Sequence, residues 1–141
     1  MSVQQRDGRS TRHRVAASHR RLDALFAKTR TAFERDLDTA RRAFGQLHDA
    51  LAVHFAQEAQ LYYPPIWTLR PERKESLAAF LGQHETFCAQ LVEIRQHLDR
   101  GLLSPARHTL ATLVDTFRMH EAGEEGVLRL VEEEVAAAKA D

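Results

Sequence analysis

Apolar residues recur along the chain at alternating steps of three and four, which is the repeat of one face of an α-helix. Four segments carry such a stripe, over about residues 12–34, 38–62, 72–99 and 105–137. The alternation of apolar and polar residues that marks a half-buried strand is absent from the sequence. Since each stripe must be buried against others, the pattern predicts an all-α fold, an up-down-up-down antiparallel four-helix bundle.

Residues that cap or break helices stand near the expected helix ends. They are Asp36, Asp38, Pro64-Pro65, Pro71, Gly101, Ser104 and Pro105. Ser104, directly before Pro105, is suited to cap the last helix, and Gly101 is suited to end the third. We therefore expect the bundle over residues 12–137, with a flexible lead-in over 1–11 and a short tail over 138–141.

Length and charge narrow the class of protein. The 141 residues suit one domain, and 20 acidic residues balance 20 basic ones, so no basic excess points to nucleic acid. No apolar run is long enough to cross a bilayer, and the basic N-terminal segment lacks the apolar stretch of a secretion signal. The single cysteine, Cys88, rules out an internal disulfide and fits a cytoplasmic protein.

Each predicted stripe contains one histidine where an apolar residue would be expected. These histidines are His19, His54, His84 and His120. Two of them are followed one turn later by a glutamate on the same stripe, Glu58 after His54 and Glu124 after His120. Burying an imidazole or a carboxylate without a partner is unfavourable, so these six residues require a shared partner.

The spacing of the four histidines predicts that they lie at one height in the bundle. Residues on consecutive helices are level when the turn lies midway between them, and the three midpoints fall between 36 and 37, at 69 and at 102, all in predicted turns. An error of two residues shifts a level by only about 3 Å. Imidazole with carboxylate suits iron, zinc, copper or manganese, and two carboxylates with four imidazoles suggest two ions. The alternative is four separate core histidines, which leaves their common height unexplained.

At these segments the chain resembles the hemerythrin-like family, also called HHE cation-binding domains. The resemblance runs from about residue 12 to 135, through "SHRRLDALF", "HFAQEAQLYYP", "HETF" and "HEAGEEGVL". It implies a four-helix bundle that holds two non-haem irons with an oxo or hydroxo bridge, and an open position for dioxygen, peroxide or nitric oxide. The ligands that it implies are Glu58 and Glu124, which bridge the irons, His19 and His54 on one iron, and His84 and His120 on the other.

The chain departs from the oxygen-carrying members of the family at Cys88, where those members have another histidine. Three interpretations remain open: a small buried apolar residue, an iron or zinc ligand, or a redox-active thiol near the centre. If Cys88 is not a ligand, water, Glu85 or a tyrosine would fill the position. That outcome weakens the case for reversible oxygen carriage and favours peroxide chemistry.

Two further positions are open. Some family members place the last carboxylate at the position of Glu125, but Glu124 lies on the stripe and Glu125 is turned ~100° away from it, so Glu124 is favoured. Tyr62, one turn after Glu58, either hydrogen-bonds to the site or is an aromatic residue at the bundle end with its hydroxyl in water. The second interpretation of Tyr62 is favoured.

The sequence leaves three classes of function. The first is a protein that binds or senses dioxygen or nitric oxide, or takes up iron; any signalling output would need a protein partner. The second is a catalase- or peroxidase-like enzyme that consumes hydrogen peroxide, and the ligands alone do not separate it from the first. The third is a metal-free helical interaction domain. The Glu-x-x-His motif of ferritin-like proteins and the His-Glu-x-x-His motif of zinc proteases are both absent.

Overall fold

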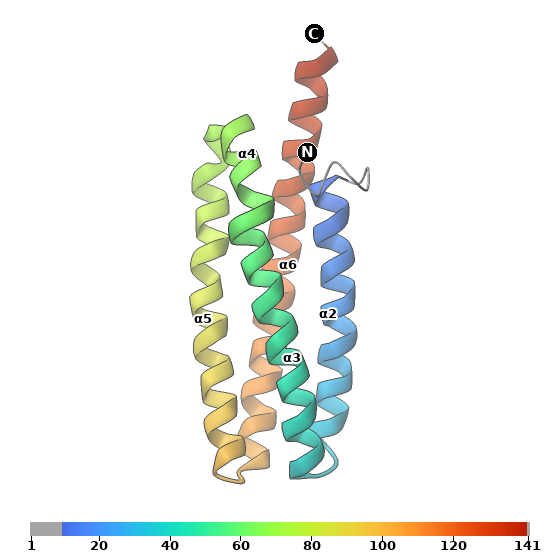
Figure 1. Ribbon diagram of the computed structural model, residues 1–141, viewed down its shortest axis with the longest axis vertical. Coiled ribbons are helices and arrows are strands. Elements are labelled where there is room, and N and C mark those ends of the chain that lie inside the picture. The colour runs from blue at the N-terminus through green and yellow to red at the C-terminus, as the bar shows by residue number, and fades with distance from the viewer. Residues whose placement is uncertain (1–9, 141) are drawn as a thin grey trace.

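The structure is a computed structural model that describes residues 10–140. Four long helices run side by side along the longest axis of the molecule (Figure 1). They are α2 (Thr11–Phe33), α3 (Leu37–Gln57), α5 (Lys74–Asp99) and α6 (Leu103–Ala140). Three short elements join α3 to α5: the π-helix η1 (Glu58–Tyr62), the α-helix α4 (Tyr63–Leu69) and the 3₁₀-helix η2 (Pro71–Arg73). Residues 10–140 contain no strand, so the predicted all-α four-helix bundle is confirmed.

The helices alternate in direction around the bundle. The turns α2–α3 and α5–α6 lie at one end, whereas α4, η2 and the start of α2 lie at the other end, past which α6 continues (Figure 1). Helix α6 packs against both α2 and α5, and α3 packs against the same two helices. Every long helix therefore presents one face to a shared core.

Two of the predicted helix ends are confirmed in atomic detail. Asp36 caps α3, because its Oδ1 accepts a hydrogen bond from the Thr39 amide at 2.8 Å. Gly101 follows α5 with a positive φ of 71°, and the amide of Leu102 donates to the carbonyl of His97 at 2.8 Å. This is the hydrogen-bonding pattern of a Schellman motif, in which glycine takes the left-handed conformation without strain.

The predicted cap at Ser104 is wrong. Helix α6 begins at Leu103, so Ser104 and Pro105 both lie inside its first turn. A proline is tolerated there because the first amides of a helix have no partner within the helix. At the far end, α6 runs to Ala140, beyond the expected end at residue 137.

The expected break at Pro64-Pro65 is also wrong, because the helical path continues to Leu69. Each proline lacks an amide hydrogen, and its ring would clash in a regular α-helix with the carbonyl four residues before it. The chain widens at this point into the π-turn η1, in which the Tyr63 amide donates to the carbonyl of Glu58. The wider turn contains one extra residue, which rotates every later side chain of this path relative to an unbroken α-helix.

Most of the predicted lead-in, residues 1–9, lies outside the described residues, and Ser10 caps α2 by accepting a hydrogen bond from the His13 amide at 3.2 Å. Within residues 10–140 no helix has the length and apolar character needed to cross a membrane.

The core consists of two apolar clusters with a polar layer between them. The larger cluster lies toward the α2–α3 and α5–α6 turns and includes Phe26, Phe44, Leu91, Leu110 and Phe117. The smaller one lies toward α4 and includes Val15, Tyr63, Ile66, Leu77 and Leu128. Each fully buried large apolar side chain contributes about 1.5–3 kcal/mol. These two clusters thus stabilise a bundle that carries buried polar groups between them.

Candidate metal centre

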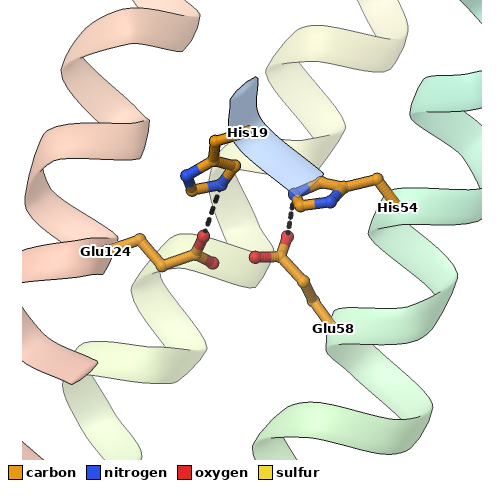
Figure 2. A group of neighbouring side chains, drawn as sticks. All are labelled: His19, His54, Glu58 and Glu124. Atoms are coloured by element: carbon orange, nitrogen blue, oxygen red, sulfur yellow. Dashed lines mark ion pairs between the residues drawn. The ribbon is translucent and has the colours of Figure 1, made fainter. Parts of the chain in front are cut away.

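The polar layer contains the six residues that the sequence analysis singled out. We call them the His/Glu cluster; their exposed fractions lie between 0 and 8%, and they are His19, His54, Glu58, His84, His120 and Glu124. The four stripe histidines also converge as predicted, because their ring nitrogens belong to two groups of neighbouring ligand atoms that share Glu58. Figure 2 shows His19 from α2, His54 from α3 and the two glutamates with their side chains directed toward one another.

Within residues 10–140, ligand atoms of the His/Glu cluster form two groups whose members lie within 4.8 Å of one another. One group contains His19, His54, Glu58 and Glu124, and the other contains Glu58, His84 and His120. Glu58 belongs to both groups. The two groups therefore meet at this carboxylate.

The facing atoms are close but are not hydrogen-bonded. Nε2 of His19 lies 2.9 Å from Oε1 of Glu124, and Oε1 of Glu58 lies 3.3 Å from Nε2 of His54 and 2.9 Å from Nε2 of His84. These atoms and Nε2 of His120 are buried and have no hydrogen-bond partner among the described residues. Unpartnered buried donors and acceptors are rare in folded proteins. A bound cation would satisfy all of them, so the donor set fits a metal centre.

The outer nitrogens of three of these histidines have partners that orient the rings. Nδ1 of His54 lies 2.7 Å from Oγ of Ser18, and Nδ1 of His120 lies 2.6 Å from Oε1 of Gln83. Nδ1 of His19 lies 3.0 Å from Oε2 of Glu125. Because the Gln83 and Glu125 oxygens only accept, the Nδ1–H of His120 and of His19 donates. The lone pairs at their Nε2 atoms then point into the centre, as in metal-bound histidines.

Burial shifts the pKa values of three groups in the metal-free centre. It lowers the pKa of His54 and of His120 to about 4, so both imidazoles are neutral near pH 7, as metal ligands must be. Burial also raises the pKa of Glu124 well above its usual range, and the neighbouring Glu58 carboxyl raises it further.

A tyrosine that the sequence analysis missed joins the two carboxylates. The Tyr63 hydroxyl donates a hydrogen bond to Oε2 of Glu124 and lies 3.4 Å from Oε2 of Glu58. In an unbroken α-helix Tyr62 would share the face of Glu58, but the extra residue in η1 brings Tyr63 onto that face instead. Tyr62 is 7% exposed and packs in the smaller apolar cluster toward α4, which agrees with the favoured interpretation of an aromatic residue at the bundle end. The double proline after Tyr63 is the sequence feature that could have indicated this change of register.

Phenylalanine rings enclose the histidines on the side of the larger cluster. Phe55 stacks on His84 with 4.2 Å between ring centroids, and Phe117 stacks on His120 at 5.7 Å. Phe117 also meets the rings of His19 and His54 edge-on. This apolar wall excludes water, which strengthens electrostatic interactions inside the centre.

The remaining predicted positions lie outside the His/Glu cluster. Cys88 and Glu85 are exposed, so the interpretation of Cys88 as a buried apolar residue is wrong, and among the described residues neither belongs to a group of potential metal ligands. The stripe of α5 steps by three from His84 to Phe87, which turns Cys88 outward. Glu125 accepts the hydrogen bond from His19 and lies behind that ring.

Another carboxyl group near the centre was also missed. Glu121 is 5% exposed, its Oε2 lies 3.7 Å from Nδ1 of His19, and burial together with a hydrogen bond to Asp23 raises its pKa to about 9. Its position directly after His120 gave no signal, because adjacent residues on a helix point about 100° apart.

Comparison with known proteins agrees with this geometry. The family model described as "Hemerythrin HHE cation binding domain" matches residues 10–129. Searches of curated proteins and of solved structures gave no match to the chain. The matched range includes every residue of the His/Glu cluster.

Proposed function

The chain belongs to the hemerythrin HHE cation-binding domain family, and we propose that its His/Glu cluster holds two non-haem iron ions that bind or react with a small oxidant or gas. Dioxygen, nitric oxide and hydrogen peroxide are the candidates. The observation that carries this proposal is the set of buried imidazole and carboxylate atoms that lack hydrogen-bond partners among the described residues. They fall into two groups that share Glu58, which supports two ions rather than one.

The contacts support a specific assignment of ligands. His19 and His54 would hold one iron, and His84 and His120 would hold the other. Glu58 is suited to bridge, because its Oε1 faces His54 and His84. Glu124 is suited to bridge because Oε1 faces His19 at 2.9 Å while Oε2 faces His120 at 3.9 Å.

Iron is the proposed metal because the likeness to hemerythrins implies it, although zinc and manganese accept the same donors. Bound there, a pair of irons with an oxo or hydroxo bridge would supply electrons and a coordination position for the small molecule. The chain supplies the rest. Tyr63 holds the bridging carboxylates, Ser18 and Gln83 orient two histidines, and the phenylalanine wall excludes bulk water.

One observation favours a second candidate, a catalase- or peroxidase-like enzyme. Cys88 stands where the oxygen carriers have a further histidine, and it is exposed rather than directed into the centre. The iron held by His84 and His120 would then have fewer protein ligands and more positions open to small molecules. An ion with several open positions is better suited to consuming peroxide than to holding dioxygen reversibly.

The test is a titration of the iron-loaded protein. Under anaerobic conditions, ferrous protein should give new visible absorption bands with nitric oxide and be oxidised by one equivalent of hydrogen peroxide. Repeated peroxide additions, without and then with an added electron donor, separate the candidates. A catalase-like enzyme continues to remove peroxide by disproportionation, a peroxidase-like enzyme continues when the donor supplies two electrons per peroxide, and the binding protein stops after one turnover. Glu85→Gln, an exposed change beside His84, is the control and should behave like the wild type. An iron-loaded protein inert to all three molecules would contradict the proposal.

A further inference from the structure

The outer partners of the cluster histidines differ in charge. His19 donates from Nδ1 to the carboxylate of Glu125 at 3.0 Å. His120 donates from the same atom to the neutral amide oxygen of Gln83 at 2.6 Å, and Nδ1 of His54 meets the Ser18 hydroxyl. One histidine in each proposed iron position therefore has a strong acceptor behind it, but only the acceptor behind His19 is a carboxylate.

A carboxylate behind a metal-bound imidazole changes how the ring binds metal. By accepting the Nδ1–H bond it draws that proton away from the ring and makes Nε2 a stronger donor. Stronger donation favours the higher charge on the metal. A neutral amide has a weaker effect, because hydrogen bonds to charged acceptors are about twice as strong as neutral ones.

We propose that Glu125 makes the two metal positions unequal, as a positioning residue that acts through His19. The inference rests on the proposed iron pair. When a one-electron reductant gives one electron to a pair of ferric ions, the ion held by His84 and His120 becomes ferrous. The ion held by His19 and His54 stays ferric until a second electron arrives. The centre thus has a fixed site of first reduction, on the side of Gln83.

Two substitutions of opposite effect test the proposal, since one removes the carboxylate behind His19 and the other introduces one behind His120. Glu125→Gln removes the charge but keeps an oxygen that can accept from His19. Gln83→Glu adds a carboxylate behind His120 in nearly the same volume. Glu133→Gln, an exposed change two turns later on α6, alters the net charge equally and serves as the control.

The measurement is a mediated redox titration of the iron-loaded protein, with the mixed-valence state followed by electron paramagnetic resonance. In Glu125→Gln the ion held by His19 and His54 should be reduced more easily. The equilibrium constant of this second reduction should rise about tenfold, which is ~59 mV for one electron, while the potential of the first reduction changes little. Gln83→Glu should make the first reduction harder. Both variants narrow the gap between the two potentials and lower the mixed-valence population, and Glu133→Gln leaves the gap unchanged.

The outcomes separate this inference from the proposed function. Two irons in the wild type with potentials that Glu125→Gln does not move would overturn the inference and leave the function standing. A changed unfolding midpoint of metal-free Glu125→Gln with an unchanged gap would show a merely structural role and also overturn it. If the protein holds zinc instead of iron, Glu125→Gln must weaken zinc binding at one position about 10–100-fold, and unchanged binding contradicts the inference. A wild type without metal overturns both proposals.

Discussion

Glu58 on η1 and His84 on α5 face each other across the bundle, with 2.9 Å between the carboxylate Oε1 and the imidazole Nε2. The same oxygen lies 3.3 Å from Nε2 of His54, one turn earlier on its own helical path. A single carboxylate thus faces both halves of the centre. Its loss should affect two metal positions, whereas the loss of one histidine should affect one.

Glu58→Gln should reduce the bound metal from about two ions to fewer than one per chain. The amide has no charge to balance two cations, and only one of its two terminal atoms can donate a lone pair. Metal content per folded chain, measured by elemental analysis after removal of loose ions, checks this. Glu85→Gln should retain both ions. A Glu58→Gln protein with two tightly held ions would show that Glu58 is not a shared ligand.

Replacement of His54 should change how stability depends on pH. In the metal-free protein its pKa is about 4, whereas in the unfolded chain it lies near 6.5. Between these values the unfolded chain binds a proton that the folded one does not, so the free energy of unfolding decreases as the pH falls from 6.5 to 4. The contribution of His54 to this loss is about 3 kcal/mol at most.

His54→Gln removes that contribution, because glutamine does not titrate in this pH range. The wild type therefore loses more free energy of unfolding than the variant when the pH falls from 7 to 4. The difference between the two losses should be roughly 2–3 kcal/mol. Urea unfolding of both metal-free proteins at the two pH values measures the difference. If the free energies of unfolding of variant and wild type differ by the same amount at pH 7 and pH 4, His54 titrates alike in the folded and unfolded chains.

Tyr63→Phe should weaken metal binding about 10–100-fold while the bundle stays folded. The change removes the hydroxyl that donates to Glu124, but it keeps the ring that packs in the smaller apolar cluster. Competition with a chelator of known affinity gives the metal dissociation constants, and far-ultraviolet circular dichroism reports the fold. Wild-type affinity in a folded Tyr63→Phe protein would exclude this hydroxyl from holding the carboxylates.

Cys88→Ser should leave metal content and visible absorption unchanged. The side chain is exposed, and no group of potential ligands among the described residues includes it. The measurement is a comparison of spectrum and metal content with those of the wild type prepared in parallel. Loss of an ion, or of an absorption band, would make the thiol a ligand after all.

Much of the fold follows from the sequence, because the predicted stripes repeat every three to four residues in α2, α5 and α6. Among their positions, Phe80 on α5 and Val127 on α6 are half-buried and the others are buried. The first stripe, from Val15 through His19 to Phe33, is buried at every predicted position. The convergence of the histidines follows from the same regularity, since an up-down bundle with short turns leaves little freedom in height.

The predictions are wrong where the helical path departs from that regularity. Pro64-Pro65 suggested a break, but they widen the preceding turn instead and exchange Tyr62 for Tyr63 beside the carboxylates. A regular three-to-four repeat assumes 3.6 residues in every turn, so it does not predict a turn with an extra residue. The outer partners Ser18 and Gln83 were missed for another reason: each contacts a histidine on a different helix, so no spacing along the chain connects them.

Metal content of the purified, iron-reconstituted protein, recorded with its visible absorption spectrum, decides whether the His/Glu cluster holds an iron pair. We expect about two irons per chain and the charge-transfer bands of an oxo- or hydroxo-bridged ferric pair. Two zinc or manganese ions would keep the centre but contradict the iron chemistry. No bound metal after anaerobic reconstitution would contradict a metal centre of any kind, and the buried histidines would then be core residues only.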